Sequence, residues 1–444
     1  MTINNLHFSR FSFIFEREGK YLIYNSRLNC FLEVSQELYM LLLTINMTHE
    51  WQLLDTDVLD LLIKQKIFVK EDEDDDYIDE LEFQHNIYTY SSARLNITIA
   101  TTTNCNLRCP YCFEKDKNNT LMSQSICDSI LDFLSQHKYA KEISICWYGG
   151  EPLLNPTAIE YLLEKITRLE SLKLIGHSII SNTTIINNRI IDLFKRYPLN
   201  MFQVTLDGNK ESHDKRRYKA NMQGTFDLIL CNLHRLVKEL PNTRFDVRVN
   251  IDKTNSKDYI EIRDLFKKEF PTSKNIFIYP GILRKYGDCD LYNFFTSKDT
   301  LEFFEEMDRL GYPLEIYPSK RQKGCSATCT NNYVIGPEGE LYNCWEDVGN
   351  KKLVIGSVLS EKMNNQDSMI KYIKHGVPFS NEKCRKCGLF PICNGGCPKK
   401  RLSLNKDDLK SLCYIFRQKE YDALYDFLYR YYKRVKNLNA KKMD

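Results

Sequence analysis

The sequence predicts an α/β protein with a central parallel sheet, a smaller module before it and a cysteine-rich segment after it. Between about residues 91 and 310, short apolar runs alternate with amphipathic stretches, which is typical of parallel strands joined by helices. Residues 1–90 show a strand-and-helix pattern of their own, and cysteines recur at close spacing from residue 325 onward. A chain of 444 residues is longer than one hydrophobic core usually organises, so we expect several domains.

Residues 1–90 are expected to form a winged-helix-like module. Ser35 and Asp55 are typical N-caps for two helices. Residues 16–20 read as a hairpin turn between the first two strands. The expected strands are Phe11–Phe15, Tyr21–Tyr24 and Ile67–Val69.

A winged helix is also a DNA-binding fold, so this alternative has to be weighed. The second helix carries only Lys64 and Lys66 as basic residues, and the acidic run Glu71–Asp76 follows at once. Carboxylates repel phosphate, so we expect no nucleic-acid partner. We interpret the acidic run as a solvated linker.

The central region is expected to hold six strands with helices between them. The strands are Leu95–Ala100, Ile143–Trp147, Ser178–Ser181, Phe202–Leu206, Phe245–Ile251 and Asn275–Tyr279. The helices are 123–134, 157–169, 189–196, 225–240 and 259–266, with a further one around Leu301–Leu310. The carboxyl ends of parallel strands meet at one edge, so residues just after the strands are candidates for chemistry.

Three cysteines, Cys105, Cys109 and Cys112, follow the first of these strands. Three thiolates can hold three irons of a [4Fe-4S] cluster and leave the fourth iron open to a ligand that is not protein. A zinc site completed by distant residues, or three core cysteines, is the alternative, since structural zinc requires four ligands.

The loop Cys105-Asn106-Leu107-Arg108-Cys109-Pro110-Tyr111-Cys112, with Tyr111 in the aromatic place, resembles the signature of radical S-adenosylmethionine (radical SAM) enzymes. The resemblance implies a partial, TIM-like (β/α)6 barrel over residues 91–310. It also implies that the amino and carboxylate groups of S-adenosylmethionine (SAM) chelate the open iron.

Segments after the later strands resemble the motifs with which this family contacts SAM. Glu151 would add charge near the ammonium, and Arg217 would pair with the carboxylate through its planar fork. Asn182-Thr183 stands where relatives commonly have Asn-Gly, and we expect His213 to be a loop histidine that bonds its neighbours. The contacts implied by the resemblance are Tyr111, Gly149, Gly150, Glu151, Pro152, Ser181, Asn182, Thr205, Arg217 and Asn250.

The second cysteine field, in residues 311–415, resembles the SPASM domain of this family in order and spacing. Its members are Cys325, Cys329, Cys344, Cys384, Cys387, Cys393, Cys397 and Cys413. The resemblance implies two auxiliary [4Fe-4S] clusters, the first on Cys325, Cys329, Cys344 and Cys397 and the second on Cys384, Cys387, Cys393 and Cys413. A pair of zinc sites is the competing interpretation, because C-x2-C is equally a zinc-knuckle spacing.

The other cysteines lie apart from both fields, and we read them as small core residues. They are Cys30, Cys127, Cys146, Cys231 and Cys289. The last segment, 416–444, is expected to be an amphipathic helix whose aromatic stripe serves for packing.

The resemblance implies an oxidoreductase with three [4Fe-4S] clusters, in which a reduced cluster cleaves SAM to a 5′-deoxyadenosyl radical that abstracts hydrogen from a peptide or protein. Sulfatase maturases, which make formylglycine from Ser or Cys, have Asp directly after the cysteine that corresponds to Cys344. Here that residue is Trp345, which favours a maturase of ribosomally made peptides that forms a thioether or carbon–carbon cross-link. Glu346 or Asp347 is a candidate base, although acidic pairs in loops are more often solvated.

Further expectations concern partners and location. The N-terminal module is expected to bind a leader peptide at a sheet edge, and a flavodoxin- or ferredoxin-type protein is the expected reductant. A net charge of +3, the lack of a long apolar run and the lack of a signal-peptide pattern predict a cytoplasmic protein without a membrane partner. An iron–sulfur relay or regulator without turnover is the alternative from another class.

Overall fold

The structure, a computed structural model, describes residues 6–50, 53–112, 114, 119–283, 293–312, 318–319, 324–360, 365–393, 395–405, 408–413 and 421–440. The chain divides into two compact units. Unit 1 comprises Met1–Thr89, Glu315–Thr328 and Lys371–Asp444, and unit 2 comprises Tyr90–Leu314 and Cys329–Ile370.

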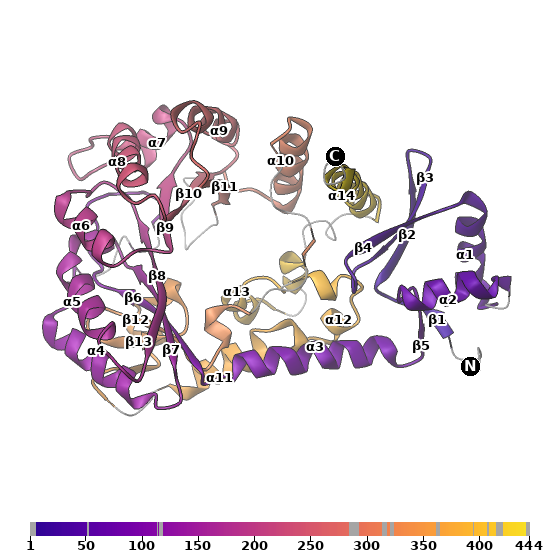
Figure 1. Cartoon of the computed structure of the whole chain (residues 1–444), viewed down its shortest axis with the longest axis horizontal. Coiled ribbons are helices and arrows are strands. Elements are labelled where there is room, and N and C mark those ends of the chain that lie inside the picture. The colour runs from indigo at the N-terminus through magenta and orange to yellow at the C-terminus, as the bar shows by residue number, and fades with distance from the viewer. Residues whose placement is uncertain are drawn as a thin grey trace. The chain divides into compact units, whose positions relative to one another are not determined.

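Unit 2 is built on one sheet whose strands lie in the order β11-β10-β9-β8-β7-β6-β12-β13-β14 (Figure 1). The strands that follow the predicted repeat are β6 (Arg94–Ala100), β7 (Glu142–Tyr148), β8 (Lys173–Ser181), β9 (Met201–Leu206), β10 (Arg244–Ile251) and β11 (Ile276–Ile282). The helices are α4 (Gln124–Gln136), α5 (Pro156–Ile166), α6 (Asn188–Arg196), α7 (Lys210–Arg216), α8 (Phe226–Glu239), α9 (Asp258–Glu269) and α10 (Ser297–Arg309). All neighbouring pairs from β6 to β11 are parallel, which confirms the predicted fold class.

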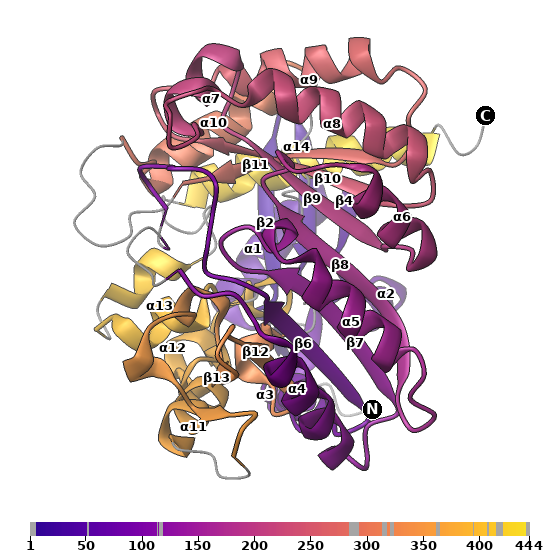
Figure 2. The ribbon, with the colours of Figure 1, turned by 90° about the vertical axis from the view of Figure 1, so that its left-hand side faces the viewer.

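The two faces of this sheet differ in character because side chains alternate along each strand. Ile97, Trp147 and Val247 are fully buried or nearly so, as expected for a face on which helices pack. Figure 2 shows the connecting helices lying along one side of the strands. Residues of the opposite parity, such as Asn96 and Gln203, are polar and only half-buried. The inner face of the partial barrel is therefore polar.

The sheet continues into a part of the chain that the sequence assigned to the cysteine-rich segment. β12 (Asn332–Ile335) pairs in parallel with β6, and Asn96 Nδ2 donates to Asn332 Oδ1 at 2.8 Å. β13 (Glu340–Tyr342) and β14 (Gly356–Ser357) then add antiparallel strands. Strands this short carry too little periodicity to be recognised from sequence.

Unit 1 contains the N-terminal module. β2 (Ser12–Arg17), β3 (Lys20–Asn25) and β4 (Cys30–Val34) form an antiparallel meander, and β1 (Leu6–Phe8) pairs with β5 (Phe68–Lys70). The predicted hairpin turn is present, and its two central residues, Glu18 and Gly19, have left-handed backbone conformations with φ of 51° and 70°. Helices α1 (Gln36–Thr48) and α2 (Thr56–Lys64) begin at the predicted caps Ser35 and Asp55, whose side chains accept backbone N–H groups.

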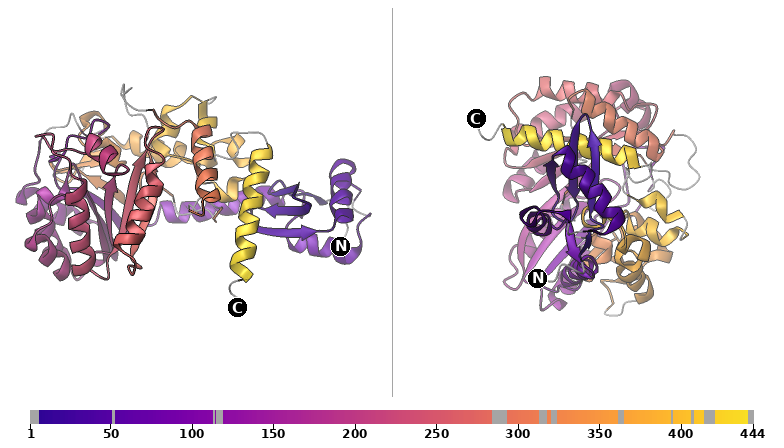
Figure 3. Two further views of the ribbon diagram at one scale, coloured as in Figure 1. Left: turned by 90° about the horizontal axis from the view of Figure 1, so that it is seen from above. Right: turned by 90° about the vertical axis from the view of Figure 1, so that its right-hand side faces the viewer.

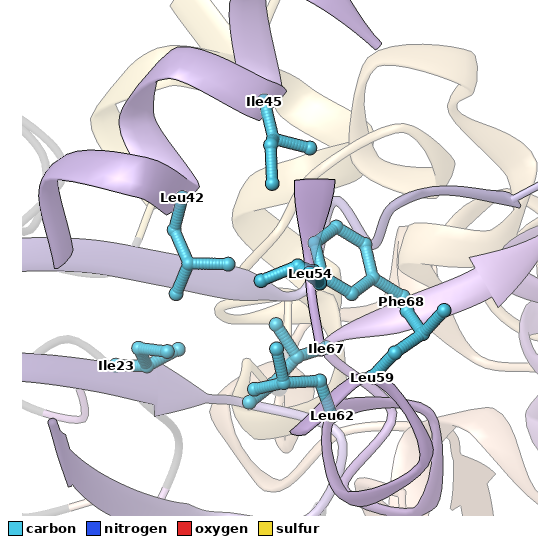
Figure 4. Close-up of a cluster of buried hydrophobic side chains, with 8 residues drawn as sticks. All are labelled: Ile23, Leu42, Ile45, Leu54, Leu59, Leu62, Ile67 and Phe68. Carbon is cyan, nitrogen blue, oxygen red and sulfur yellow. The ribbon is translucent and has the colours of Figure 1, made fainter. Parts of the chain in front are cut away.

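A buried apolar cluster joins both helices to the strands of this module (Figure 4). The members of this cluster are Ile23, Leu42, Ile45, Leu54, Leu59, Leu62, Ile67 and Phe68. Burying one such side chain fully contributes about 1.5–3 kcal/mol to folding.

The acidic run is not a linker, contrary to the sequence interpretation. It supplies the first turn of α3 (Glu73–Thr89), where carboxylates meet the positive end of the helix dipole. Asp74 is 2% exposed and accepts from Ser9 Oγ and from the backbone N–H of Arg10, each at 2.8 Å. The run therefore anchors the start of α3 to Ser9 and Arg10 within unit 1.

The C-terminal helix α14 (Tyr421–Ala440) packs on the three-stranded meander, as its aromatic stripe predicted (Figure 3). Tyr425 stacks on Phe15 with ring centroids 5.0 Å apart, and Arg17 forms an ion pair with Asp426 at 2.7 Å. Phe427 and Leu428 are fully buried.

The cysteine-rich part of unit 1 contains α12 (Glu382–Arg385) and α13 (Pro398–Ser403). The last segment of unit 1 starts at Lys371, which lies inside α11 (Gln366–His375). Arg385 ties this part to α3 through ion pairs with Asp79 and Glu82.

The outlying cysteines only partly fit the core interpretation. Cys127 is buried, and Cys30 and Cys146 are half-buried. Cys231 is exposed on α8, because it lies on the outer face of that helix, so its assignment to the core was wrong. Cys289 lies outside the described residues. Among the described helices, none has the length and apolar character that a membrane crossing requires.

Candidate functional site

The cysteine loop leaves the carboxyl end of β6 and places three thiols in unit 2. Backbone amides two residues downstream donate to two of the sulfurs: Leu107 N to Cys105 Sγ and Glu114 N to Cys112 Sγ, both at 3.4 Å. Burial raises the pKa of the Cys105 thiol to about 11 and that of the Cys109 thiol to about 12. A metal centre is what stabilises buried thiolates, so the donor set suits one.

Gly149 and Gly150 pack directly against the backbone that precedes the cysteine loop. A Cβ on Gly149, whose φ is 130°, would lie 2.1 Å from Thr102 O, and one on Gly150 would lie 2.3 Å from Asn104 O. Gly150 N and Glu151 N donate to these same carbonyl oxygens at 3.0 and 2.8 Å. Both positions therefore require glycine, because any side chain would clash with the backbone that leads into the cysteine loop.

Glu151 is fully buried and joins the segment after β7 to the end of β8. Its carboxylate accepts from Ser181 Oγ at 2.9 Å, from Asn182 N at 2.7 Å and from Leu153 N at 3.0 Å. Burial raises its pKa to about 6, although these donors oppose the shift. Its contact with an ammonium stays a prediction.

Asn182 holds the cysteine loop from the neighbouring strand end. Its Nδ2 donates to Asn106 Oδ1 at 2.8 Å and lies 3.7 Å from Cys105 Sγ. Thr184 donates to Asn182 Oδ1 through both its backbone N–H and its hydroxyl. The ribose contact predicted for Ser181 and Asn182 is untested, and their present partners are protein atoms.

Tyr111 stands at the centre of a buried polar network. Its hydroxyl donates to Asp207 Oδ1 at 2.8 Å and accepts from Arg217 at 3.2 Å and from Asn250 Nδ2 at 3.1 Å. Asp207 is fully buried, and burial raises its pKa. The sequence analysis assigned no role to Asp207, although its position directly after β9 was an available signal.

This network has unused hydrogen-bonding capacity where a polar cofactor would lie. Asn104 Oδ1, next to the cysteine loop in sequence, and Asp207 Oδ2 and Arg217 Nε of the network are buried and have no hydrogen-bond partner among the described residues. Two are acceptors and one is a donor, and SAM offers an ammonium, hydroxyls and a carboxylate. Thr205, 8% exposed, precedes Asp207 on β9. The residues therefore fit a cluster with SAM.

His213 is buried on α7, so its placement in a loop was wrong, because residues 210–216 form a short helix capped by Asn209. Its Nδ1 accepts from Asp207 N at 3.2 Å, and its Nε2 lies 3.0 Å from Thr225 Oγ1. Burial lowers its pKa well below the ordinary value. It bonds its neighbours, as expected.

Trp345, Glu346 and Asp347 form a single 3-10 turn directly after Cys344. Trp345 is 45% exposed and stacks on Tyr148, with ring centroids 5.6 Å apart and planes at 23°. Burial raises the pKa of Tyr148 well above its ordinary value; Glu114, Cys112 and Cys146 add to this, and Glu346 makes the smallest of these contributions. Asp347 is 2% exposed, so the expectation of a solvated acidic pair was wrong for it.

Four cysteines of unit 1 line one cavity, together with apolar side chains and Arg401. They are Cys384, Cys387, Cys393 and Cys413. Gly395 N donates to Cys393 Sγ at 3.4 Å, which repeats the contact seen in the cysteine loop. The cavity gathers the set that the sequence assigned to the second auxiliary cluster, and a [4Fe-4S] cluster fits four thiol donors in an apolar wall.

The other four cysteines of the second field are divided between the units. Cys325 and Cys397 belong to unit 1, and Cys329 and Cys344 to unit 2, so the first auxiliary cluster stays a prediction. Within the described residues, no three His, Cys, Asp or Glu side chains lie close enough together for a single metal ion. A four-iron cube requires wider spacing of its thiolates than one ion does.

The family model for the Radical SAM superfamily matches residues 99–266. The cysteine-type anaerobic sulfatase-maturating enzyme of Clostridium novyi (strain NT) is 24% identical over 337 residues, which cover 68% of this chain and 86% of the relative. The antilisterial bacteriocin subtilosin biosynthesis protein AlbA of Bacillus subtilis (strain 168) is 25% identical over 356 residues, 74% of either chain.

Two solved structures share the fold. Native anSMEcpe with bound AdoMet matches with a TM-score of 0.58 and 20% identity, over 78% of this chain and 99% of the other. Streptococcus suis SuiB bound to S-adenosylmethionine matches with a TM-score of 0.50 and 15% identity, over 88% and 95%. We conclude that residues 99–266 of this chain, which include the cysteine loop and the buried network behind it, form a domain of the radical SAM superfamily of enzymes.

Proposed function

We propose that this protein is a radical SAM maturase that modifies a peptide or protein substrate. The observation that carries the proposal is the set of three half-buried thiols backed by the Tyr111 network, because an electron carrier needs no polar site beside its cluster. When bound, the cluster and SAM supply a 5′-deoxyadenosyl radical that abstracts a hydrogen atom from the substrate.

The chain's own residues would hold the cofactor in place. The Arg217 guanidinium, with its Nε unpartnered, would bind the SAM carboxylate, since guanidinium and carboxylate match in geometry. Asn104 Oδ1 and Asp207 Oδ2 would accept from its ammonium or hydroxyl groups. The glycine pair and Asn182 would keep the cysteine loop rigid while these contacts form.

We further propose that the substrate is a ribosomally made peptide and that the product is a thioether or carbon–carbon cross-link. Trp345 supports this choice, because an indole stacked on Tyr148 cannot take a proton as an aspartate would. AlbA, named for bacteriocin biosynthesis, is one of the relatives.

Formylglycine formation is the second candidate, and it is favoured by the sulfatase-maturating relatives. In that case Glu346, which is half-buried and electrostatically close to Tyr148, would serve as the base. Asp347 is the less suitable of the pair because it is buried.

The N-terminal meander supports recognition of a leader peptide. In the part of the chain that the structure describes, β2 and β4 each pair only with β3, so the sheet has two edges to which an extended peptide could add a strand. This role is separable from the chemistry and is tested by anisotropy of a labelled leader on the full-length protein.

One anaerobic experiment tests the proposal. Dithionite-reduced, reconstituted protein is incubated with SAM and with short peptides encoded next to it, and 5′-deoxyadenosine and peptide masses are measured. A peptide that loses two hydrogens and does not label with a hydrazide indicates a cross-link, whereas hydrazide labelling indicates formylglycine. A protein that carries iron but releases no 5′-deoxyadenosine would instead be a relay or regulator.

A further inference from the structure

Arg401 is the one charged side chain among the described residues that line the four-cysteine cavity. It lies on α13 and is 8% exposed. Its two terminal nitrogens lie 3.9 and 4.0 Å from Cys384 Sγ, and one of them donates to Gly395 O at 2.5 Å. Its Nε is buried and has no hydrogen-bond partner among the described residues.

A buried guanidinium is costly without a compensating negative charge. No described carboxylate lines this cavity, whose other lining groups are thiols, apolar side chains and a glycine. Four thiolates around an iron–sulfur cube would supply that charge. The Arg401 position is therefore explained by an anionic occupant of the cavity.

The carbonyl of Gly395 fixes the direction of the side chain. Gly395 has φ of 75° and a Cβ there would lie 2.7 Å from the Pro378 ring, so the loop that carries this carbonyl is itself held against the cavity wall. Because one nitrogen is anchored on this carbonyl, the guanidinium faces Cys384 rather than solvent.

We propose that Arg401 sets the reduction potential of the cluster in the four-cysteine cavity by placing a fixed positive charge beside Cys384. The inference rests on the proposed iron–sulfur function of that cavity. Reduction by an external one-electron donor adds one negative charge and breaks no bond, so a nearby cation stabilises the reduced form and raises the potential. Arg401 is a positioning residue in this role, since it touches the thiolate and not the substrate.

The test is an EPR-monitored redox titration of the full-length, reconstituted protein, with iron and sulfide measured in each sample. Arg401→Gln removes the charge, Arg401→Lys keeps it, and Lys383→Gln is the control because Lys383 is exposed and adjacent in sequence to Cys384. We expect Arg401→Gln to shift the reduction equilibrium at least tenfold toward the oxidised form, which for one electron is about 59 mV. Arg401→Lys should recover most of the shift, and Lys383→Gln should show none.

Each outcome decides the matter. An unchanged potential in Arg401→Gln at full iron content overturns the proposal. Loss of the cluster from Arg401→Gln but not from Arg401→Lys overturns it, because the charge then serves to retain the cluster and not to set its potential. Loss from both variants overturns it, because Arg401 then only shapes the loop at Gly395. Failure of the underlying function looks different: the unmodified protein would hold zinc, or would lose no iron on Cys387→Ala.

Discussion

The phenol of Tyr111 is the residue-scale link between the cysteine loop and the strand ends opposite it. It bonds to groups on three other segments, those of Asp207, Arg217 and Asn250. A hydrogen bond to a charged group contributes about 1.5–3 kcal/mol, so the orientation of Asp207 and Arg217 depends on this hydroxyl.

Tyr111→Phe should therefore weaken SAM binding about tenfold, which is about 1.4 kcal/mol, while iron content stays unchanged. Anaerobic equilibrium dialysis with SAM measures the effect. Tyr161→Phe is the matched control, because it removes a hydroxyl that bonds to Asp128 at the surface. Equal affinities in the two variants would contradict a role of the network in cofactor binding.

Cys109→Ala should abolish release of 5′-deoxyadenosine, since two thiolates do not hold a cluster of this kind. Chromatographic quantification of 5′-deoxyadenosine after dithionite reduction provides the measurement. Cys127→Ala, which removes a buried thiol from α4 outside both cysteine fields, should retain the activity. Residual cleavage in Cys109→Ala would show that the loop is not the cluster site.

At the scale of elements, His177 joins β7 to β8 in the barrel wall. Trp147 Nε1 donates to His177 Nδ1 at 3.0 Å, and His177 Nε2 lies 3.1 Å from Tyr197 O. Burial lowers the pKa of His177 from 6.5 to about 4, so the folded protein keeps this imidazole neutral.

Between about pH 6.5 and pH 4, His177 is protonated in the unfolded chain but neutral in the folded protein. His177 therefore lowers the free energy of unfolding as the pH falls through this range. The loss is at most about 1.4 kcal/mol per pH unit. His177→Gln should lack this part of the pH dependence, and denaturant unfolding at pH 7.5 and 5.5 measures it. A variant with the same loss as the unmodified protein would show that other groups cause the dependence.

Helix α3 depends on Asp74, which receives two hydrogen bonds in the first turn. Asp74→Ala should lower the free energy of unfolding by about 2 kcal/mol, because Ser9 and the Arg10 amide are left without their acceptor. Asp76→Ala, in the same turn but exposed, should change it by less than about 0.5 kcal/mol. Chemical denaturation followed by circular dichroism distinguishes the two.

At the scale of the whole molecule, the cysteine sites should be separable in function. Cys387→Ala should still release 5′-deoxyadenosine, since the cysteine loop is intact, but should give no modified peptide. Parallel assays of 5′-deoxyadenosine and of peptide mass check this. Full product from Cys387→Ala would contradict a role of the four-cysteine cavity in turnover.

The alternation of apolar runs and amphipathic stretches was enough to predict the parallel sheet, because this periodicity can be read directly from the sequence. The grouping of Cys384, Cys387, Cys393 and Cys413 came from the family resemblance and stays a prediction, supported by the cavity that these four residues line. Asp207 was missed because a buried acid after a strand looks like any loop carboxylate until its partners are known. The acidic first turn of α3 was misread because composition alone cannot show that Asp74 meets Ser9.

The pairing of β12 with β6 has a consequence for biosynthesis. The partner of Asn96, Asn332, is synthesised 236 residues later, so β6 lacks its neighbour β12 until then. At roughly 5–20 residues per second on the ribosome, β6 stays an unpaired edge strand of the nascent chain for roughly 10–50 s. We expect newly made protein to depend on holdase chaperones during this interval, and a message truncated before codon 332 to yield insoluble product.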